Sequence, residues 1–143
     1  MGLLLLLLRI LLGIGLFKGM LLFSLVGADV HYYDFVTKSM VVVNESFPGS
    51  VIHVRKGDTA YIDVHNQGPY GVTLQWHGVK QHRNPWSDGP AYVTQCQVEP
   101  NTNFTYEVIF ISEDGTLWWH AHSDWTRSSV HGAIVIHPTE GTT

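Results

Sequence analysis

The sequence has 143 residues, enough for one domain of ordinary size and too few for a second large one. Its formal charge is −4, and its 8 lysines and arginines do not cluster, which argues against a nucleic-acid-binding surface or a polybasic membrane patch. The single cysteine, Cys96, excludes an internal disulfide and a Cys-x-x-Cys metal or redox motif.

The first 28 residues are almost all apolar and predict a secretory signal peptide. Two basic residues interrupt the run, so no uncharged stretch reaches the about 18–20 residues of a membrane-spanning helix. Small residues precede Asp29, and we expect cleavage after Gly27 or Ala28. An uncleaved signal anchor is the alternative. The signal peptide predicts a secreted, extracellular protein with no stable membrane anchor after cleavage and a mature domain at 29–143.

The mature domain contains short alternating or β-branched runs that are typical of strands. We expect strands at His31–Thr37, Met40–Val43, Val51–Val54, Thr59–Val64, Val72–Trp76, Phe104–Ile111, Thr116–His120 and Gly132–Ile136. Turn residues separate these runs, and no segment has a sustained helical period. This pattern predicts an all-β fold, a β-sandwich with Greek-key connections. The long irregular stretch from Lys80 to Gln97 is expected to be functional.

Two sequons are present, Asn44-Glu45-Ser46 and Asn103-Phe104-Thr105. In a secreted protein such sequons are candidate sites of surface N-glycans, although each also arises by chance.

Three histidines in aromatic segments form a candidate metal site. Within 118–122, which reads WWHAH, His120 and His122 are two positions apart, so in a strand both side chains leave on the same side. His77, in the earlier Trp76-His77-Gly78 segment, is the candidate third ligand. Imidazole binds copper and zinc, and the Irving–Williams order favours copper. Ordinary strand histidines with hydrogen-bond partners are the alternative, and a zinc site remains chemically possible.

Five motifs follow one another along the chain: Phe47-Pro48-Gly49, Trp76-His77-Gly78, Trp86-Ser87-Asp88-Gly89-Pro90, Thr94-Gln95-Cys96 and Trp118-Trp119-His120-Ala121-His122. In this order they resemble the first cupredoxin domain of the plant laccases, which are blue multicopper oxidases. The similarity extends from about His31 to Pro138. It implies a cupredoxin-type (plastocyanin-like) β-sandwich. It also implies a secreted, apoplastic oxidoreductase family that oxidises phenols such as lignin precursors while it reduces dioxygen.

The resemblance also implies roles for individual residues. His77 matches a ligand of the type 3 copper pair in the trinuclear cluster that reduces dioxygen. His120 and His122 match two more ligands, shared between the two coppers of that pair. Asp88 matches a carboxylate near the cluster that helps to deliver protons, which makes it the candidate catalytic residue. On sequence alone, a turn residue before Gly89 is the stronger interpretation of Asp88.

The sequence departs from the laccase pattern in two places. Gln75 stands where the family has a histidine ligand of the type 2 copper, and an amide is a poorer copper ligand than imidazole. We therefore expect a weak or empty type 2 site. The His-Cys-His signature that marks the type 1 copper in the third laccase domain does not occur in these residues. The cysteine that would pair with Cys96 belongs to the same missing region, which leaves Cys96 as a free thiol or an intermolecular link.

Two functions are therefore in view. The first is the copper-binding domain of a laccase-like oxidase, whose phenol and dioxygen chemistry requires the full-length context, so that the isolated chain is expected to be inactive. The second is a non-catalytic secreted copper-binding domain that associates with a partner through the face that other cupredoxin domains cover in laccases. A mononuclear blue-copper carrier is excluded, because its cysteine ligand needs a histidine and usually a methionine downstream.

Overall fold

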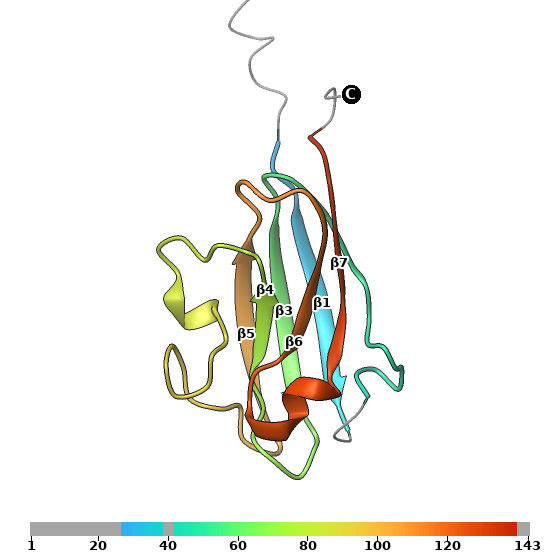
Figure 1. Ribbon diagram of the computed structural model, residues 1–143, viewed down its shortest axis with the longest axis vertical. Helices are drawn as coiled ribbons and strands as arrows, with labels where there is room; N and C mark the ends of the chain where they lie inside the picture. Colours follow the sequence, from blue (N-terminus) through green and yellow to red (C-terminus); the bar gives the residue numbers. More distant parts are fainter. Residues whose placement is uncertain (1–26, 39–41, 140–143) are drawn as a thin grey trace, which may run out of the picture.

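The computed structural model describes residues 27–38 and 42–139 of the chain (Figure 1). Residues 1–26, which contain most of the predicted signal peptide, lie outside this description. Within the two described ranges, no helix is both long and apolar enough to cross a membrane.

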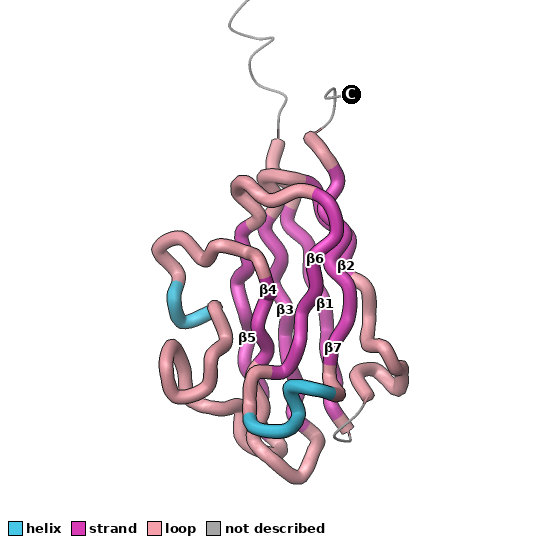
Figure 2. The backbone as a smooth tube through the Cα atoms, viewed as in Figure 1, coloured by secondary structure: helices cyan, strands magenta, loops and turns pink. Residues whose placement is uncertain are grey.

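Short strands supply most of the regular structure, which confirms the predicted all-β class (Figure 2). The strands are β1 (Val30–Thr37), β2 (Ile52–Arg55), β3 (Thr59–Asn66), β4 (Leu74–His77), β5 (Thr102–Ile109), β6 (Gly115–Ala121) and β7 (His131–His137). Two short 3₁₀ turns, η1 (Pro85–Ser87) and η2 (Asp124–Ser128), interrupt the connections.

The strands form a two-layer sandwich, as predicted. One sheet has the order β1-β3-β5, and the other has the order β2-β7-β6-β4. Strand β1 runs parallel to β3 and β2 runs parallel to β7, whereas β6 is antiparallel to both of its neighbours. Because most neighbours in the sheets are not consecutive in the sequence, non-local pairing determines which residues meet on each face.

One expected strand differs in the structure. Residues 40 and 41 of the run Met40–Val43 lie outside the described part of the chain, and Val43 makes only isolated bridges to Thr37 and Ser46. The chain turns immediately afterwards, because Asn44 and Glu45 both have positive φ. The Asn44 side chain then bonds to the backbone of β1, where it accepts from Val36 N at 2.8 Å and takes the place of a strand partner.

Alternating burial places large apolar side chains between the sheets. In β3 and β7 every second residue is buried, as a half-buried strand requires. Aromatic rings fill the centre of the core, where Trp76 meets Tyr106 edge to face at 5.3 Å between ring centroids. Burial raises the pKa of Tyr106 to about 12, and its hydroxyl accepts a hydrogen bond from Leu74 N. Aromatic side chains of this size bury more apolar area than any others, so they dominate the stability of the core.

Trp119 occupies the most constrained position in this core. It is fully buried and packs against Phe35 with ring centroids 4.7 Å apart. Its Nε1 donates to Ser50 O at 3.0 Å. A Cβ atom at either Gly49 or Gly132 would lie only 2.6 Å from the indole ring, so both positions need glycine for this close approach. These contacts from Gly49 and Gly132 therefore fix the position of the indole ring.

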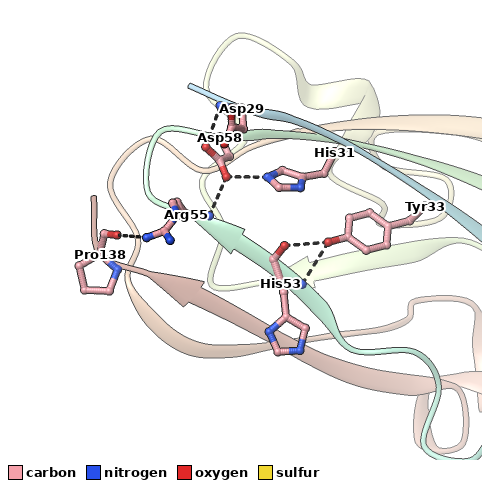
Figure 3. A network of polar contacts seen from close by, with 7 residues as sticks. All are labelled: Asp29, His31, Tyr33, His53, Arg55, Asp58 and Pro138. Carbon is pink, nitrogen blue, oxygen red and sulfur yellow. Dashed lines mark hydrogen bonds and ion pairs between the residues drawn. The ribbon is translucent and has the colours of Figure 1, made fainter. Parts of the chain in front are cut away.

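A second, polar network joins the start of β1 to the turn between β2 and β3 (Figure 3). The carboxylate of Asp58 is buried and accepts from Asp29 N at 2.9 Å, from Arg55 N at 2.7 Å and from His31 Nε2 at 2.7 Å. Burial opposes the charged form of Asp58, but the hydrogen bonds from Arg55, Asp29 and His31 outweigh it and lower the pKa of Asp58.

The substitution Asp58→Asn is expected to destabilise the domain by about 2 kcal/mol or more, because either orientation of the amide places its nitrogen against an N–H donor that now bonds to a carboxylate oxygen. Urea denaturation followed by tryptophan fluorescence measures this change. Asp114→Asn, at an exposed aspartate outside this network, is the control and should change stability by no more than about 0.5 kcal/mol.

The same network predicts how stability responds to acid. Because the pKa of folded Asp58 lies below its usual value of about 3.9, the stabilisation is complete above that value and is lost as the pH falls through the folded pKa. The Asp58→Asn variant should lose this part of the acid dependence. An identical pH profile for both proteins would contradict the role given to Asp58.

Candidate metal centre

The antiparallel pairing of β4 and β6 brings the predicted ligands to one face of the four-stranded sheet. Gln75 lies opposite His120, and His77 lies opposite Trp118. Paired residues leave a sheet on the same side, so all four project outward, away from the core. His122 follows just after β6, where its backbone N donates to Thr73 O at 2.8 Å and prolongs the pairing with β4.

The three histidines form a row with His120 at its centre. The ring centroids are 5.6 Å apart between His77 and His120, and 5.9 Å apart between His120 and His122. Their ligand nitrogens do not all lie within 4.8 Å of one another. The three imidazoles therefore lie side by side along the sheet without converging within that distance.

His120 is preorganised as a metal ligand. Its Nδ1 faces Ala121 O at 2.8 Å, and since a carbonyl only accepts, Nδ1 carries the hydrogen. The lone pair is then on Nε2, which is buried without a hydrogen-bond partner. Burial lowers the pKa of His120 against the opposing hydrogen bond to Ala121, and the nearby positive charges of histidine and arginine lower it further. A buried, neutral and unpartnered nitrogen costs free energy in the metal-free protein, and a bound metal ion removes that cost.

Trp118 covers the outer side of this row. Its ring centroid lies 4.4 Å from that of His120 and 5.4 Å from that of His77. The side chain nevertheless remains 42% exposed, so it shields the histidines and also presents an apolar surface to solvent.

Two further residues reach the site that sequence reasoning did not assign to it. His131 in β7 is the cross-strand neighbour of His120, and its ring packs edge-on against Phe47 at 5.3 Å. Arg127 in η2 donates to Nδ1 of His122 at 3.3 Å. The spacing of Arg127 from His122 was visible in the sequence, but the register that brings His131 beside His120 was not.

Asp88 lies in the long irregular connection between β4 and β5 that the sequence predicted. Its carboxyl is half-buried. Burial raises the pKa of Asp88, and the charge of His122 partly offsets this shift, so the two groups interact electrostatically. The residue also caps η1, consistent with its interpretation as a turn residue. A turn position and proximity to the histidine row are thus compatible.

The backbone around Asp88 is fixed against β4. Ser87 O accepts from Trp76 Nε1 at 2.9 Å, which ties the loop to a core tryptophan. Gly89 has φ +102°, and a Cβ there would lie 1.9 Å from Leu74 O. Only glycine allows this approach, and the approach determines the position of Asp88.

Gln75 and Cys96 are the remaining residues that the sequence singled out. Gln75 is half-buried beside His120, where it offers an amide in place of a third imidazole on these strands. Cys96 is exposed and carries a free thiol in the described residues. Its pairing with another cysteine stays a prediction.

A family model described as multicopper oxidase matches residues 26–141. The chain is 54% identical over 128 residues to "Putative laccase-1" of Oryza sativa subsp. japonica and 45% identical over 129 residues to "Laccase-12" of Arabidopsis thaliana. Each match covers 82% of this chain, but only 22% and 23% of the respective relatives. The chain thus spans about a fifth of the length of these relatives.

Solved structures show the same fold. A blue copper oxidase from Nitrosomonas europaea matches 79% of this chain and 40% of its own with a TM-score of 0.72 and 26% identity. A laccase from Botrytis aclada matches 82% of this chain and 24% of its own with the same TM-score and 24% identity. These matches confirm the predicted cupredoxin-type sandwich.

We expect His120 to take up its second proton at a lower pH than an unperturbed imidazole, whose pKa is about 6.5, because burial lowers the pKa of His120. Nitrogen-15 NMR of the metal-free protein should show a protonated Nδ1 and a bare Nε2 for this ring. His120→Ala identifies the signals. A His120 ring that becomes doubly protonated at or above the pH at which a free imidazole does so would contradict the burial described above.

The substitution Gly89→Ala should destabilise the domain by about 2 kcal/mol or more, because it combines a strained φ with a clash against β4. The matched control is Gly57→Ala, where φ is +101° but a Cβ meets nothing within 4 Å. Thermal unfolding of both variants separates the strain, which they share, from the contact, which only Gly89 makes. Equal losses would show that the contact with Leu74 does not anchor Asp88.

Proposed function

Because this chain belongs to the multicopper oxidase family, we propose that it is the N-terminal copper-binding domain of a laccase-like oxidase. The observation that carries the proposal is the buried Nε2 of His120, which has no partner and lies between His77 and His122 on one face of a rigid sheet. The family match over 26–141 and the identity to plant laccases support copper as the metal. Zinc would satisfy the same three imidazoles chemically, so metal preference is part of the test.

His77, His120 and His122 would hold copper, and the bound copper would supply the redox capacity for dioxygen reduction. The protein supplies orientation and protection from water. Hydrogen bonding to Ala121 O fixes the ring of His120, and Trp118 shields the row from solvent. Asp88 serves as a proton source, because burial raises the pKa of its carboxyl and thus favours the protonated form near the histidines.

The ligand set of this domain is incomplete by itself. Gln75 contributes no imidazole, so the type 2 position is proposed to bind copper weakly even in a larger assembly. The only cysteine, Cys96, is followed by Gln97 and does not provide a blue-copper ligand set. Oxidation of phenols such as lignin precursors is therefore proposed for the full-length context, and residues 29–143 alone are proposed to be inactive.

The outer face beside the histidine row supports an interdomain role. Trp118 and Phe47 are exposed large apolar residues. Trp118 lies against His120, and Phe47 packs against His131, the cross-strand neighbour of His120. In a laccase-like protein, further cupredoxin domains would cover this face and add the missing ligands. A secreted, apoplastic location with glycans at Asn44 and Asn103 is part of the same proposal.

A second candidate function is a non-catalytic secreted copper-binding or interaction domain. The observation that favours it is Gln75, which removes one imidazole while leaving the fold intact. In this case the exposed apolar face would bind a separate partner.

Copper titration of residues 29–143 tests the proposal. His120→Ala should weaken copper binding at least about tenfold, equivalent to 1.4 kcal/mol, whereas His82→Ala in the exposed part of the long loop should not. Gln75→His should strengthen binding, because it places an imidazole opposite His120. Failure of the unmodified protein to retain copper would overturn both candidate functions.

Phenol turnover tests the proposed inactivity of the isolated chain. The isolated chain should show no steady oxidation and no intense blue absorption. Sustained phenol turnover by this chain would disprove its proposed inactivity.

A further inference from the structure

The opposite face of the sandwich carries a different cluster of potential ligands. Asp34 in β1 and Asp63 and His65 in β3 each offer one ligand atom, and these three atoms all lie within 4.8 Å of one another. Among the described residues, this is the one group of three or more histidine, cysteine, aspartate or glutamate side chains that meets this limit. The histidine row lies on the other sheet and shares no residue with it.

The strand register fixes this arrangement. In the parallel β1–β3 pair, Asp34 lies directly beside Asp63, and Val36 lies beside His65. Inward-facing Phe35 and Val64 are fully buried in the core, so the alternating residues must project outward. The three ligands are thus held by sheet backbone and not by a flexible loop.

His65 Nε2 points at both carboxylates. It lies 3.2 Å from Asp63 Oδ2 and 4.0 Å from Asp34 Oδ1. A small inward rotation of the exposed Asp34 side chain would place all three atoms at the mutual separations of ligands around a first-row metal ion.

The third strand of the sheet orients the central carboxylate. Thr105 Oγ1 donates to Asp63 Oδ1 at 3.2 Å, and Asn103 Nδ2 approaches the same oxygen at 3.4 Å. These contacts occupy Oδ1 and direct Oδ2 towards His65. Support of this kind from a neighbouring strand is what holds ligating carboxylates in protein metal sites.

The electrostatics favour a bound cation. Two carboxylates sit side by side on neighbouring strands, which is a repulsive arrangement that a sheet ordinarily avoids. The ion pairs of Asp34 and Asp63 within the described residues are both made with His65. A divalent cation would neutralise both carboxylates at once.

We propose that Asp34, Asp63 and His65 form a second divalent-metal site, selective for zinc-class ions, that clamps β1 to β3. One imidazole with two carboxylates suits Zn²⁺, whereas Ca²⁺ and Mg²⁺ prefer all-oxygen ligand sets. The site is independent of the copper proposal, because it uses other residues on another sheet.

Calorimetric titration of the metal-free protein with ZnCl₂ tests the site. Asp34→Asn keeps the shape of the side chain and removes one anionic ligand, and it should weaken one class of Zn²⁺ binding at least tenfold. It should also remove part of the rise in melting temperature that Zn²⁺ produces. His77→Ala should leave this class unchanged, which separates it from zinc binding at the histidine row.

Two further arms complete the experiment. Asp114→Asn, an exposed aspartate outside the cluster, controls for general loss of negative charge, and equal weakening by Asp34→Asn and Asp114→Asn would overturn the proposal.

His65→Asn should abolish the preference for Zn²⁺ over Ca²⁺. If Ca²⁺ binds the unmodified protein as tightly as Zn²⁺, the cluster is an ordinary acidic patch with a histidine ion pair, and the proposal fails. Metal-free Asp34→Asn should melt no lower than the unmodified protein, so that lost binding does not reflect unfolding.

Discussion

The burial of Trp119 is the constraint on which the rest of the site depends. Its indole is enclosed by Gly49 and Gly132, packs at a tilt against Phe35 and donates to Ser50 O. Because side chains alternate along β6, fixing Trp119 inside forces His120 outside. A slip of one residue would turn the histidine into the apolar core and expose the indole, at a cost of several kcal/mol in lost apolar burial and unpaired polar atoms. The orientation of the histidine row is therefore a consequence of core packing.

Strand β4 repeats the arrangement with Trp76, and there the tryptophan also positions the loop. Inside the core Trp76 packs on Tyr106, while its Nε1 reaches Ser87 O and draws the long loop onto the sheet. The contact of Gly89 with Leu74 completes this attachment. One short strand thus presents His77 outward and, through its inward side chain and its backbone, brings Asp88 towards His122.

The sequence was sufficient wherever a property depends on local periodicity. Alternation in the segment around His120 predicted the strand and the shared side of His120 and His122, and the laccase resemblance supplied the fold and the family. Prediction was wrong for Met40–Val43 in its described part, where a short apolar run resembles a strand but Asn44 and Glu45 turn the chain. Prediction missed the neighbours of His120 and the cluster at Asp34. Both depend on the register between strands distant in the sequence, which no local pattern specifies.

Gln75 illustrates how the fold separates stability from chemistry. Its neighbours Leu74 and Trp76 point into the core and carry the packing energy of β4, whereas Gln75 points outward beside His120. An imidazole-to-amide exchange at this position would remove a proposed metal ligand without opening a cavity or unpairing the ladder. The sandwich can therefore persist while its metal chemistry is weakened. The packing of the sandwich follows from the inward half of each strand, and the capacity for copper chemistry must be judged from the outward half.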